Sequence, residues 1–182
     1  PLYAVVEDIC ASGGYFVAAG GGRIYVGKAS IVGSIGVRMD GFGATGLMQK
    51  LGIERRLLTA GANKGFLDPF LPADEKQKQH AQAMLNEIHQ QFIAVVRDGR
   101  GTRLKERPDL FSGLVWTGEK SIALGLADSV GSLEQVARDV IQAEEIVDFT
   151  QKENLAEKVA RRFGAGAASA VLNLNAQSPA IR

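Results

Sequence analysis

Histidine and cysteine are scarce in this chain of 182 residues, which contains two histidines and one cysteine. The single cysteine, Cys10, cannot form a disulfide within the chain, and we interpret it as a small buried residue. No group of His, Cys, Asp and Glu has the spacing of a metal site, so we expect no metal. His80 and His89 lie beside glutamines in a helical pattern, and we interpret both as solvated surface residues.

Long hydrophobic runs and an excess of one charge are also missing. No stretch approaches the ~20 apolar residues of a membrane span. The 21 basic and 20 acidic residues leave a net charge of +1, which does not indicate a nucleic-acid-binding protein. Apolar residues make up 46% of the chain, as in a soluble globular domain. Pro1 leads directly into a strand pattern without an initiating methionine, so we expect the later part of a longer polypeptide.

Strand-like and helical segments alternate along the chain. We expect strands at 2–6, 23–26, 34–39, 53–59 and 126–130, and short helices at 15–19, 47–51 and after Thr117. A long helix begins near Pro72 and ends at Gly99 to Gly101, because its apolar residues recur at three- and four-residue spacing. The alternation indicates an α/β layered fold.

The C-terminal third begins with a capping box. Ser132 and Gln135 have its spacing, and they predict a helix that runs to Ile141. An amphipathic stretch follows over 155–172. We therefore predict a catalytic domain over 1–148 and a helical extension with a tail over 149–182.

Ser12 occupies a position with advantages for a nucleophile. It lies in the segment Ala-Ser-Gly-Gly-Tyr, directly after a strand-like run. A strand-to-helix turn there exposes the hydroxyl, and the N–H of Gly13 can point at an oxyanion. The alternative is an ordinary serine that caps a helix. The local pattern alone leaves both readings open.

Lys64 is the candidate base, because a serine needs a neighbouring group to take its proton. A lysine acts as a base only when it is neutral, and burial away from carboxylates favours this form. The neighbours of Lys64 are small, and the first acid after it is Asp68. A solvated loop lysine is the alternative.

A glycine-rich motif at 41–46 matches GxGxxG. A dinucleotide site needs a full helix after the motif and an acid at the end of the next strand. Gly52 cuts the helix short, and the end of the following strand, Leu58-Thr59-Ala60-Gly61, contains no acid. Nucleotide binding is therefore not favoured.

Several ordered segments together resemble the signal peptide peptidase A family of Ser-Lys peptidases, over roughly residues 1 to 145. The matching segments are 11–15, 32–37, 59–64, Val115–Gly118 and Gly125–Asp128. The resemblance implies that Ser12 is the nucleophile, that Lys64 is the general base, and that Ser34 orients the lysine. It also assigns the N–H of Gly13 to the oxyanion hole.

The resemblance further implies a Clp protease or crotonase-like fold, incomplete at its N-terminal side, and a dome-like homo-oligomeric ring. Substrates would be remnant signal peptides or other extended hydrophobic peptides, with no metal or organic cofactor. The catalytic domain would lie on the periplasmic side of the bacterial inner membrane, anchored through a segment outside this chain. A second oxyanion donor would precede residue 1. Two alternatives remain: a crotonase-like acyl or thioester enzyme, and a non-catalytic scaffold subunit.

Overall fold

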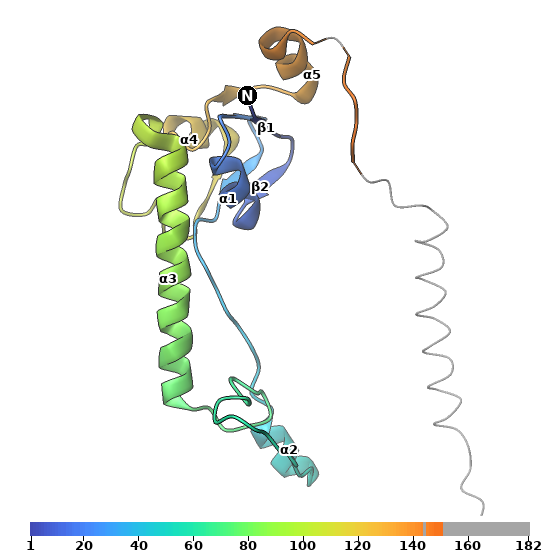
Figure 1. Cartoon of the computed structure of the whole chain (residues 1–182), viewed down its shortest axis with the longest axis vertical. Helices are drawn as coiled ribbons and strands as arrows, with labels where there is room; N and C mark the ends of the chain where they lie inside the picture. Colours follow the sequence, from blue (N-terminus) through green and yellow to red (C-terminus); the bar gives the residue numbers. More distant parts are fainter. Residues whose placement is uncertain (144, 151–182) are drawn as a thin grey trace, which may run out of the picture. The chain divides into compact units, whose positions relative to one another are not determined.

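The computed structural model describes residues 1–143 and 145–150 (Figure 1). The chain divides into two units, Pro1–Glu144 and Glu145–Arg182. The amphipathic stretch predicted over 155–172 lies outside the described residues. All helices and strands given below belong to the first unit.

Two three-stranded sheets form the centre of the first unit. One sheet has the order β1-β3-β6 and consists of β1 (Tyr3–Val6), β3 (Arg23–Val26) and β6 (Ser129–Val130), all parallel. The other has the order β2-β4-β5 and consists of β2 (Ile9–Ala11), β4 (Ile31–Gly33) and β5 (Val115–Thr117). In this sheet β2 and β4 are parallel, whereas β5 is antiparallel to β4. The predicted α/β class is confirmed, and the structure adds that most strand pairs are parallel.

The strand predicted over 34–39 is wrong, because β4 ends at Gly33 and the chain leaves the sheet at Ser34. Both residues have positive φ angles, 112° and 51°, and this left-handed backbone turns the chain out of the ladder. The strand predicted over 53–59 is also absent, since nothing pairs with this segment among the described residues. The strands β2 and β5, with three residues each, are too short for a periodicity to predict.

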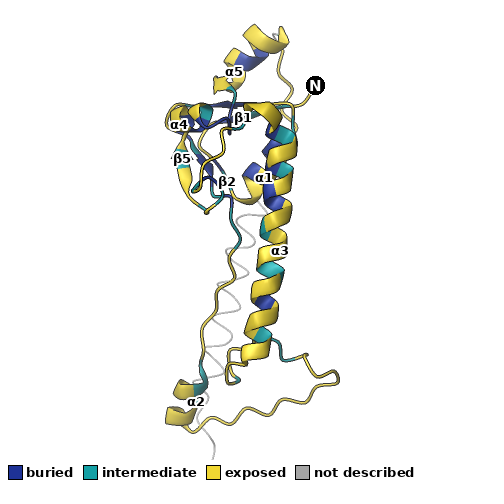
Figure 2. Cartoon of the chain, turned by 90° about the vertical axis from the view of Figure 1, so that its left-hand side faces the viewer, coloured by how far each residue is buried: buried dark blue, intermediate teal, exposed yellow. Residues whose placement is uncertain are grey.

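The long predicted helix is present as α3 (Glu75–Arg100). It begins after Asp74, whose side chain accepts hydrogen bonds from the N–H groups of Lys76 and Gln77. The helix therefore starts slightly later than Pro72. Its C-terminal half packs on the core through Phe92, Ile93 and Val96 (Figure 2).

Short helices connect the strands. They are α1 (Gly13–Ala19), α2 (Thr45–Leu51), α4 (Gly118–Ala123), α5 (Leu133–Gln135), the 3-10 turn η1 (Gly101–Arg103) and the π-helical turn η2 (Val136–Ile141). The short helices expected at 15–19, at 47–51 and after Thr117 are thus confirmed as α1, α2 and α4. The capping box of Ser132 and Gln135 is present, and the helix that it opens continues as η2.

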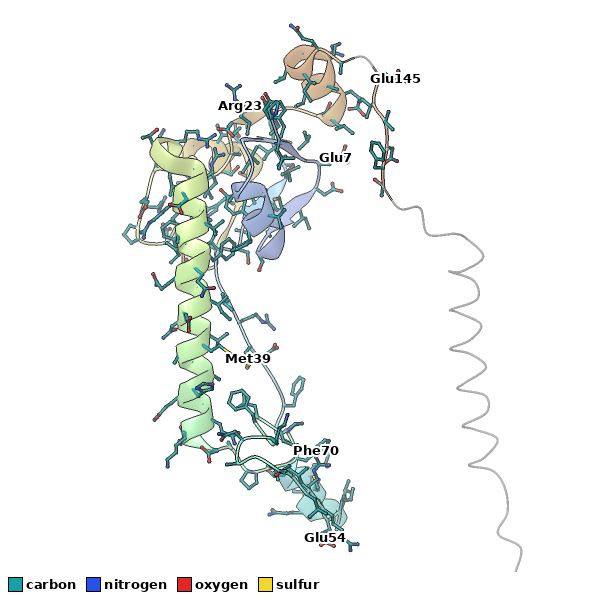
Figure 3. All side chains as sticks on the ribbon, in the orientation of Figure 1. Glu7, Arg23, Met39, Glu54, Phe70 and Glu145 are labelled. Carbon is teal, nitrogen blue, oxygen red and sulfur yellow. The ribbon has the colours of Figure 1, made fainter. Side chains whose placement is uncertain are left out.

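Residues 39–74, which we call the arm, contain α2 and lead from the sheets to the start of α3 (Figures 1 and 3). No residue of the arm is buried in the chain. Several are large and apolar, and Phe42 and Leu58 are 91% and 97% exposed. No helix among the described residues is long and apolar enough to cross a membrane.

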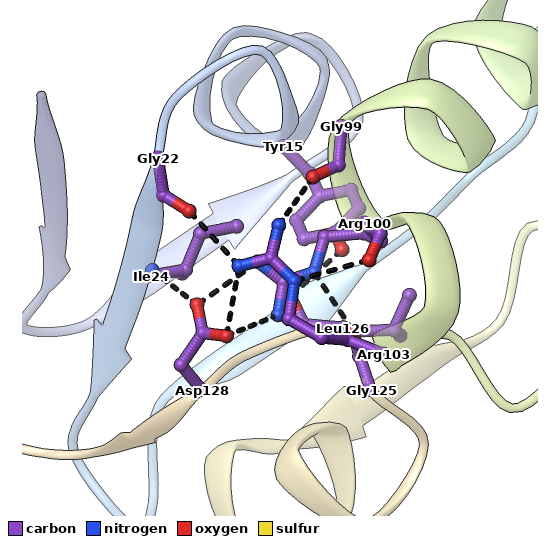
Figure 4. A network of polar contacts seen from close by, with 9 residues as sticks. All are labelled: Tyr15, Gly22, Ile24, Gly99, Arg100, Arg103, Gly125, Leu126 and Asp128. Atoms are coloured by element: carbon purple, nitrogen blue, oxygen red, sulfur yellow. Dashed lines mark hydrogen bonds and ion pairs between the residues drawn. The ribbon is translucent and has the colours of Figure 1, made fainter.

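A buried ion pair joins the C-terminal end of α3 to the turn before β6 (Figure 4). The guanidinium of Arg100, which is 1% exposed, makes two hydrogen bonds to the carboxylate of Asp128. That carboxylate also accepts a hydrogen bond from the Ile24 N–H. Burial raises the pKa of Asp128, but the bonds from Arg100 and Ile24 outweigh burial and hold it below its usual range.

The same turn holds α1 in place. The hydroxyl of Tyr15, which is fully buried, donates to the carbonyl oxygen of Leu126 at 2.8 Å. Arg100 donates from Nε to the carbonyl oxygen of Gly125. The segment 125–128 therefore fixes the helix that follows Ser12 against the end of α3.

Candidate active site

Ser12 occupies a sharp turn between β2 and α1. Its φ and ψ are 52° and −121°, a conformation that non-glycine residues rarely adopt. Its N–H donates to the carbonyl oxygen of Gly33 at 2.8 Å. Its side chain makes no capping hydrogen bond, although it stands at the N-cap position of α1. The ordinary capping role is therefore not what this hydroxyl performs, and its oxygen is free to react.

Ser12 and Ser34 line the same pocket, whose volume is about 630 Å³. Ser34 comes directly after β4, its φ is 51°, and its N–H donates to the carbonyl oxygen of Leu114. Because β2 and β4 are parallel and adjacent, the residues that follow their carboxyl ends meet at one edge of the sheet. The tertiary structure thus brings together two of the residues that the sequence singled out.

Gly13 also lines this pocket, as the first residue of α1. The first N–H groups of a helix have no partner within the helix, so this donor is available to a ligand. No atom lies within 4 Å of the place where a Cβ would stand on Gly13. A substrate can therefore approach this backbone closely.

Lys64 does not line this pocket; it is exposed, in a turn of the arm. Two residues further on, the ring of Phe66 packs against His80 of α3, whereas Phe16, beside the pocket, packs against Phe92 of α3. Twelve residues separate these contacts on one helix, a distance of about 18 Å along its axis. Within one chain, this arrangement leaves the lysine far from Ser12. The pairing of the two residues stays a prediction.

The pocket is nearly free of charge. Arg38 is the one ionisable residue among those that line it in the described part of the chain. Its guanidinium points to Asp40 at 2.7 Å in an exposed ion pair. A lysine that entered this pocket would meet no carboxylate on its walls, and this favours its neutral form. No cluster of His, Cys, Asp and Glu that could hold a metal ion occurs among the residues described.

The prediction that both histidines are solvated is wrong for one of them. His80 is exposed, as expected. His89 is half-buried, and its Nε2 lies 3.2 Å from the carbonyl oxygen of Ile35. The helical wheel placed it beside glutamines, but α3 turns this face toward the segment that leaves β4. Cys10 is buried as expected, and burial raises the pKa of its thiol.

The remaining walls of the pocket were not predicted as site residues. They are Phe16, Gly36, Val37, Arg38, Ile88, Gln91, Phe92, Ser112 and Gly113. Phe92 belongs to the apolar stripe of α3, so its burial was predictable, whereas its place beside Ser12 was not. Such contacts join segments far apart in the sequence, and no local pattern reports them.

The glycine-rich motif at 41–46 lies in the arm and does not follow a strand. It lines a second pocket together with the carboxylates Asp68 and Asp74. These negative charges disfavour a phosphate group, and α2 has only seven residues. The motif therefore lacks the preceding strand and the full following helix that a dinucleotide site needs.

Comparison with known families shows where this site belongs. The profile of Peptidase family S49 matches residues 1–147. The chain belongs to peptidase family S49. The resemblance to signal peptide peptidase A and the assignment to the serine peptidases are thereby confirmed.

Individual relatives of this S49 chain have diverse names. It is 37% identical over 161 residues to a protein of Methanocaldococcus jannaschii that is named as a protease. The aligned region covers 85% of this chain and 51% of the relative. It is 29% identical over 143 residues to the chloroplastic serine protease SPPA of Arabidopsis thaliana, covering 74% of this chain and 20% of the relative.

A third relative carries the name of a transporter. The S49 chain is 45% identical over 137 residues to the Na(+)/H(+) antiporter NhaA of Brucella abortus. The aligned region covers 75% of this chain and 19% of the relative. The chain spans about half or less of the length of these relatives. The name of an antiporter describes a whole protein of which the S49 chain matches a small part.

Proposed function

We propose that the protein is a serine endopeptidase that uses Ser12 as nucleophile and Lys64 as general base. The observation that carries this proposal is the free hydroxyl of Ser12, held at a strained turn in a pocket that Ser34 shares. Strained residues of this kind cluster at active sites. Family membership supplies the reaction class.

The proposed reaction has two halves. Neutral Lys64 takes the proton of the Ser12 hydroxyl, and Oγ attacks the carbonyl carbon of the peptide bond while the N–H of Gly13 donates to the oxyanion. The lysine ammonium then gives its proton to the leaving amine as the carbon–nitrogen bond breaks. In the second half, Lys64 deprotonates a water, which cleaves the acyl-enzyme and restores Ser12. The hydroxyl of Ser34 orients the amine without adding a negative charge.

The base is a lysine because no histidine competes for this role among the described residues. His89 is engaged with the carbonyl oxygen of Ile35, and His80 lies on the exposed arm-side part of α3. The walls of the pocket carry no carboxylate, which supports a neutral amine.

We propose that Lys64 reaches Ser12 in a homo-oligomer, where the arm of one copy enters the pocket of its neighbour. The separation of about 18 Å along α3 and the exposed apolar surface of the arm support this arrangement. The test mixes inactive copies carrying Ser12→Ala with inactive copies carrying Lys64→Ala. Recovered cleavage supports assembly between copies. No recovery in mixed oligomers means that the arm must fold back within one chain.

The substrates that fit this site best are extended hydrophobic peptides. Phe16, Ile88 and Phe92 give the pocket apolar walls. The segment 36–38 makes no backbone hydrogen bond within the described residues, and it can pair with an extended peptide as an added strand. By resemblance we propose remnant signal peptides, cleaved on the periplasmic side of a bacterial inner membrane. The same resemblance supports a Clp protease or crotonase-like arrangement of the sheets.

Fluorophosphonate labelling with mass mapping tests the nucleophile and the base together. We expect labelling on Ser12 in the wild type and its loss in both Ser12→Ala and Lys64→Ala. Labelling that survives in Lys64→Ala would contradict the dyad. A preference for thioesters with no peptide cleavage would favour the crotonase-like alternative, and an unlabelled wild type would favour a scaffold subunit.

A further inference from the structure

His89 makes a hydrogen bond that has no role in the proposed reaction. It projects from α3, in the same two turns as Ile88, Gln91 and Phe92, which line the pocket of Ser12. Its Nε2 lies 3.2 Å from the carbonyl oxygen of Ile35. A carbonyl oxygen can only accept, so Nε2 carries the hydrogen in this contact. In this contact the side chain thus acts as a donor.

The carbonyl group of Ile35 lies where the backbone stops making hydrogen bonds to neighbouring segments. Ser34 makes the last backbone hydrogen bond beside β4, through its N–H to Leu114. Residues 36–38 make none with the described part of the chain, although all three line the pocket. Ile35 itself is fully buried. The bond from His89 is therefore the last polar contact that fixes this backbone before the stretch open to a substrate.

The helix that carries His89 is itself fixed relative to the nucleophile. Phe92, one turn further along α3, packs edge-on against Phe16, with ring centroids 5.3 Å apart. Phe16 in turn belongs to α1, and its N–H donates to the carbonyl oxygen of Ser12. The helix α3 thus contacts both the Ser12 turn, through Phe92, and the segment before residues 36–38, through His89.

We infer that His89 is a positioning residue, which holds the segment 36–38 in the orientation that an extended peptide needs in order to pair with it. This role rests on the proposed peptidase function. His89 touches neither the reacting atoms nor the base, so it sets how a peptide is bound and leaves the reactivity of Ser12 unchanged. A small reagent that reacts with the hydroxyl alone does not use this segment.

Two measurements on the full chain separate an effect on peptide binding from an effect on the reactivity of Ser12. The first is kcat/KM for an internally quenched peptide with small aliphatic residues around the cleaved bond. The second is the rate at which a small alkyl fluorophosphonate labels Ser12. In His89→Leu we expect kcat/KM to fall by about three- to tenfold, the range for one net hydrogen bond, while labelling changes by less than about twofold. His89→Gln keeps an N–H donor of similar reach, and it should recover most of the loss.

The matched control is Gln90→Leu, which makes the same kind of change at an exposed neighbouring position on α3. It should leave both readouts unchanged. Unaltered peptide cleavage in His89→Leu would overturn the inference. So would an equal fall in cleavage and labelling, because that pattern means a general structural defect. A wild type that is neither labelled nor active overturns the proposed function itself, and this role with it.

Discussion

The N–H of Ser12 donates to the carbonyl oxygen of Gly33 at 2.8 Å. This bond extends the pairing of β2 with β4, in which Ala11 lies opposite Gly33. It makes Ser12 and Ser34 neighbours at the edge of the sheet, although 22 residues separate them in the chain. The backbone ladder, and not a contact between the two side chains, sets their positions. Substitutions in either side chain should therefore leave the turn intact.

Replacing Lys64 by arginine should abolish peptide cleavage. A guanidinium keeps its charge at physiological pH and cannot accept the proton of Ser12. Lys64 is exposed in the arm, so the variant should fold normally, with an unchanged circular dichroism spectrum. Lys50→Arg, also exposed in the arm, is the control and should cleave like the wild type. Residual cleavage in Lys64→Arg above that of Ser12→Ala would rule out the lysine as base.

Gly99→Ala should destabilise the protein severely. A Cβ on Gly99 would stand 1.7 Å from the carbonyl oxygen of Ala19, where α3 crosses the end of α1. Forced separation of these helices should cost about 3 kcal/mol, the upper end of the usual range for overpacking, because the contact is with backbone. Since α1 follows Ser12, fluorophosphonate labelling should fall as well. Urea denaturation measures the first effect.

Gly46→Ala is the control for that substitution. Gly46 lies in α2, with nothing within 4 Å of its Cβ position, and alanine favours a helix over glycine. A gain of about 0.5 kcal/mol is expected. Equal stability of the two variants would contradict the close crossing of α1 and α3.

Asp128→Asn should lower the free energy of unfolding by about 3 kcal/mol at neutral pH, because Arg100 keeps its buried charge without a counterion. The side chain of Asp128 is 16% exposed, so water compensates little. Asp139→Asn removes the exposed pair with Arg138 and should cost less than about 1 kcal/mol. Chemical denaturation of both variants provides the comparison. Equal losses would mean that the buried pair contributes no more than a surface pair.

The contribution of Asp128 to the free energy of unfolding should also decrease as the pH is lowered. Its folded pKa lies below the ordinary value of 3.8, so the stabilisation is fully present above that value and is lost as pH falls through the folded pKa. The stability difference between wild type and Asp128→Asn should therefore be constant above about pH 5 and shrink steadily below about pH 4. Thermal denaturation across this range measures it. A difference that grew on acidification would mean that the folded pKa is raised.

Much of the fold could be predicted from local patterns. The spacing in α3, the capping box at Ser132 and the short helix after Thr117 each depend on residues within a few positions, and each is present. The path after Ser34 could not be predicted. An apolar alternation there resembles a strand, but positive φ angles at Gly33 and Ser34 turn the chain away from its partners.

The sequence by itself determined the family, because its ordered segments match the serine peptidases of family S49. It also singled out two serines and a lysine, Ser12, Ser34 and Lys64, as the predicted site residues. Only the tertiary structure decided which of these groups meet. It places Ser12 beside Ser34, because parallel strands end at one edge, and holds Lys64 away on an exposed arm. It also joins His89 to Ile35, 54 positions apart. Contacts of that range depend on the path of the whole chain, which no short segment encodes.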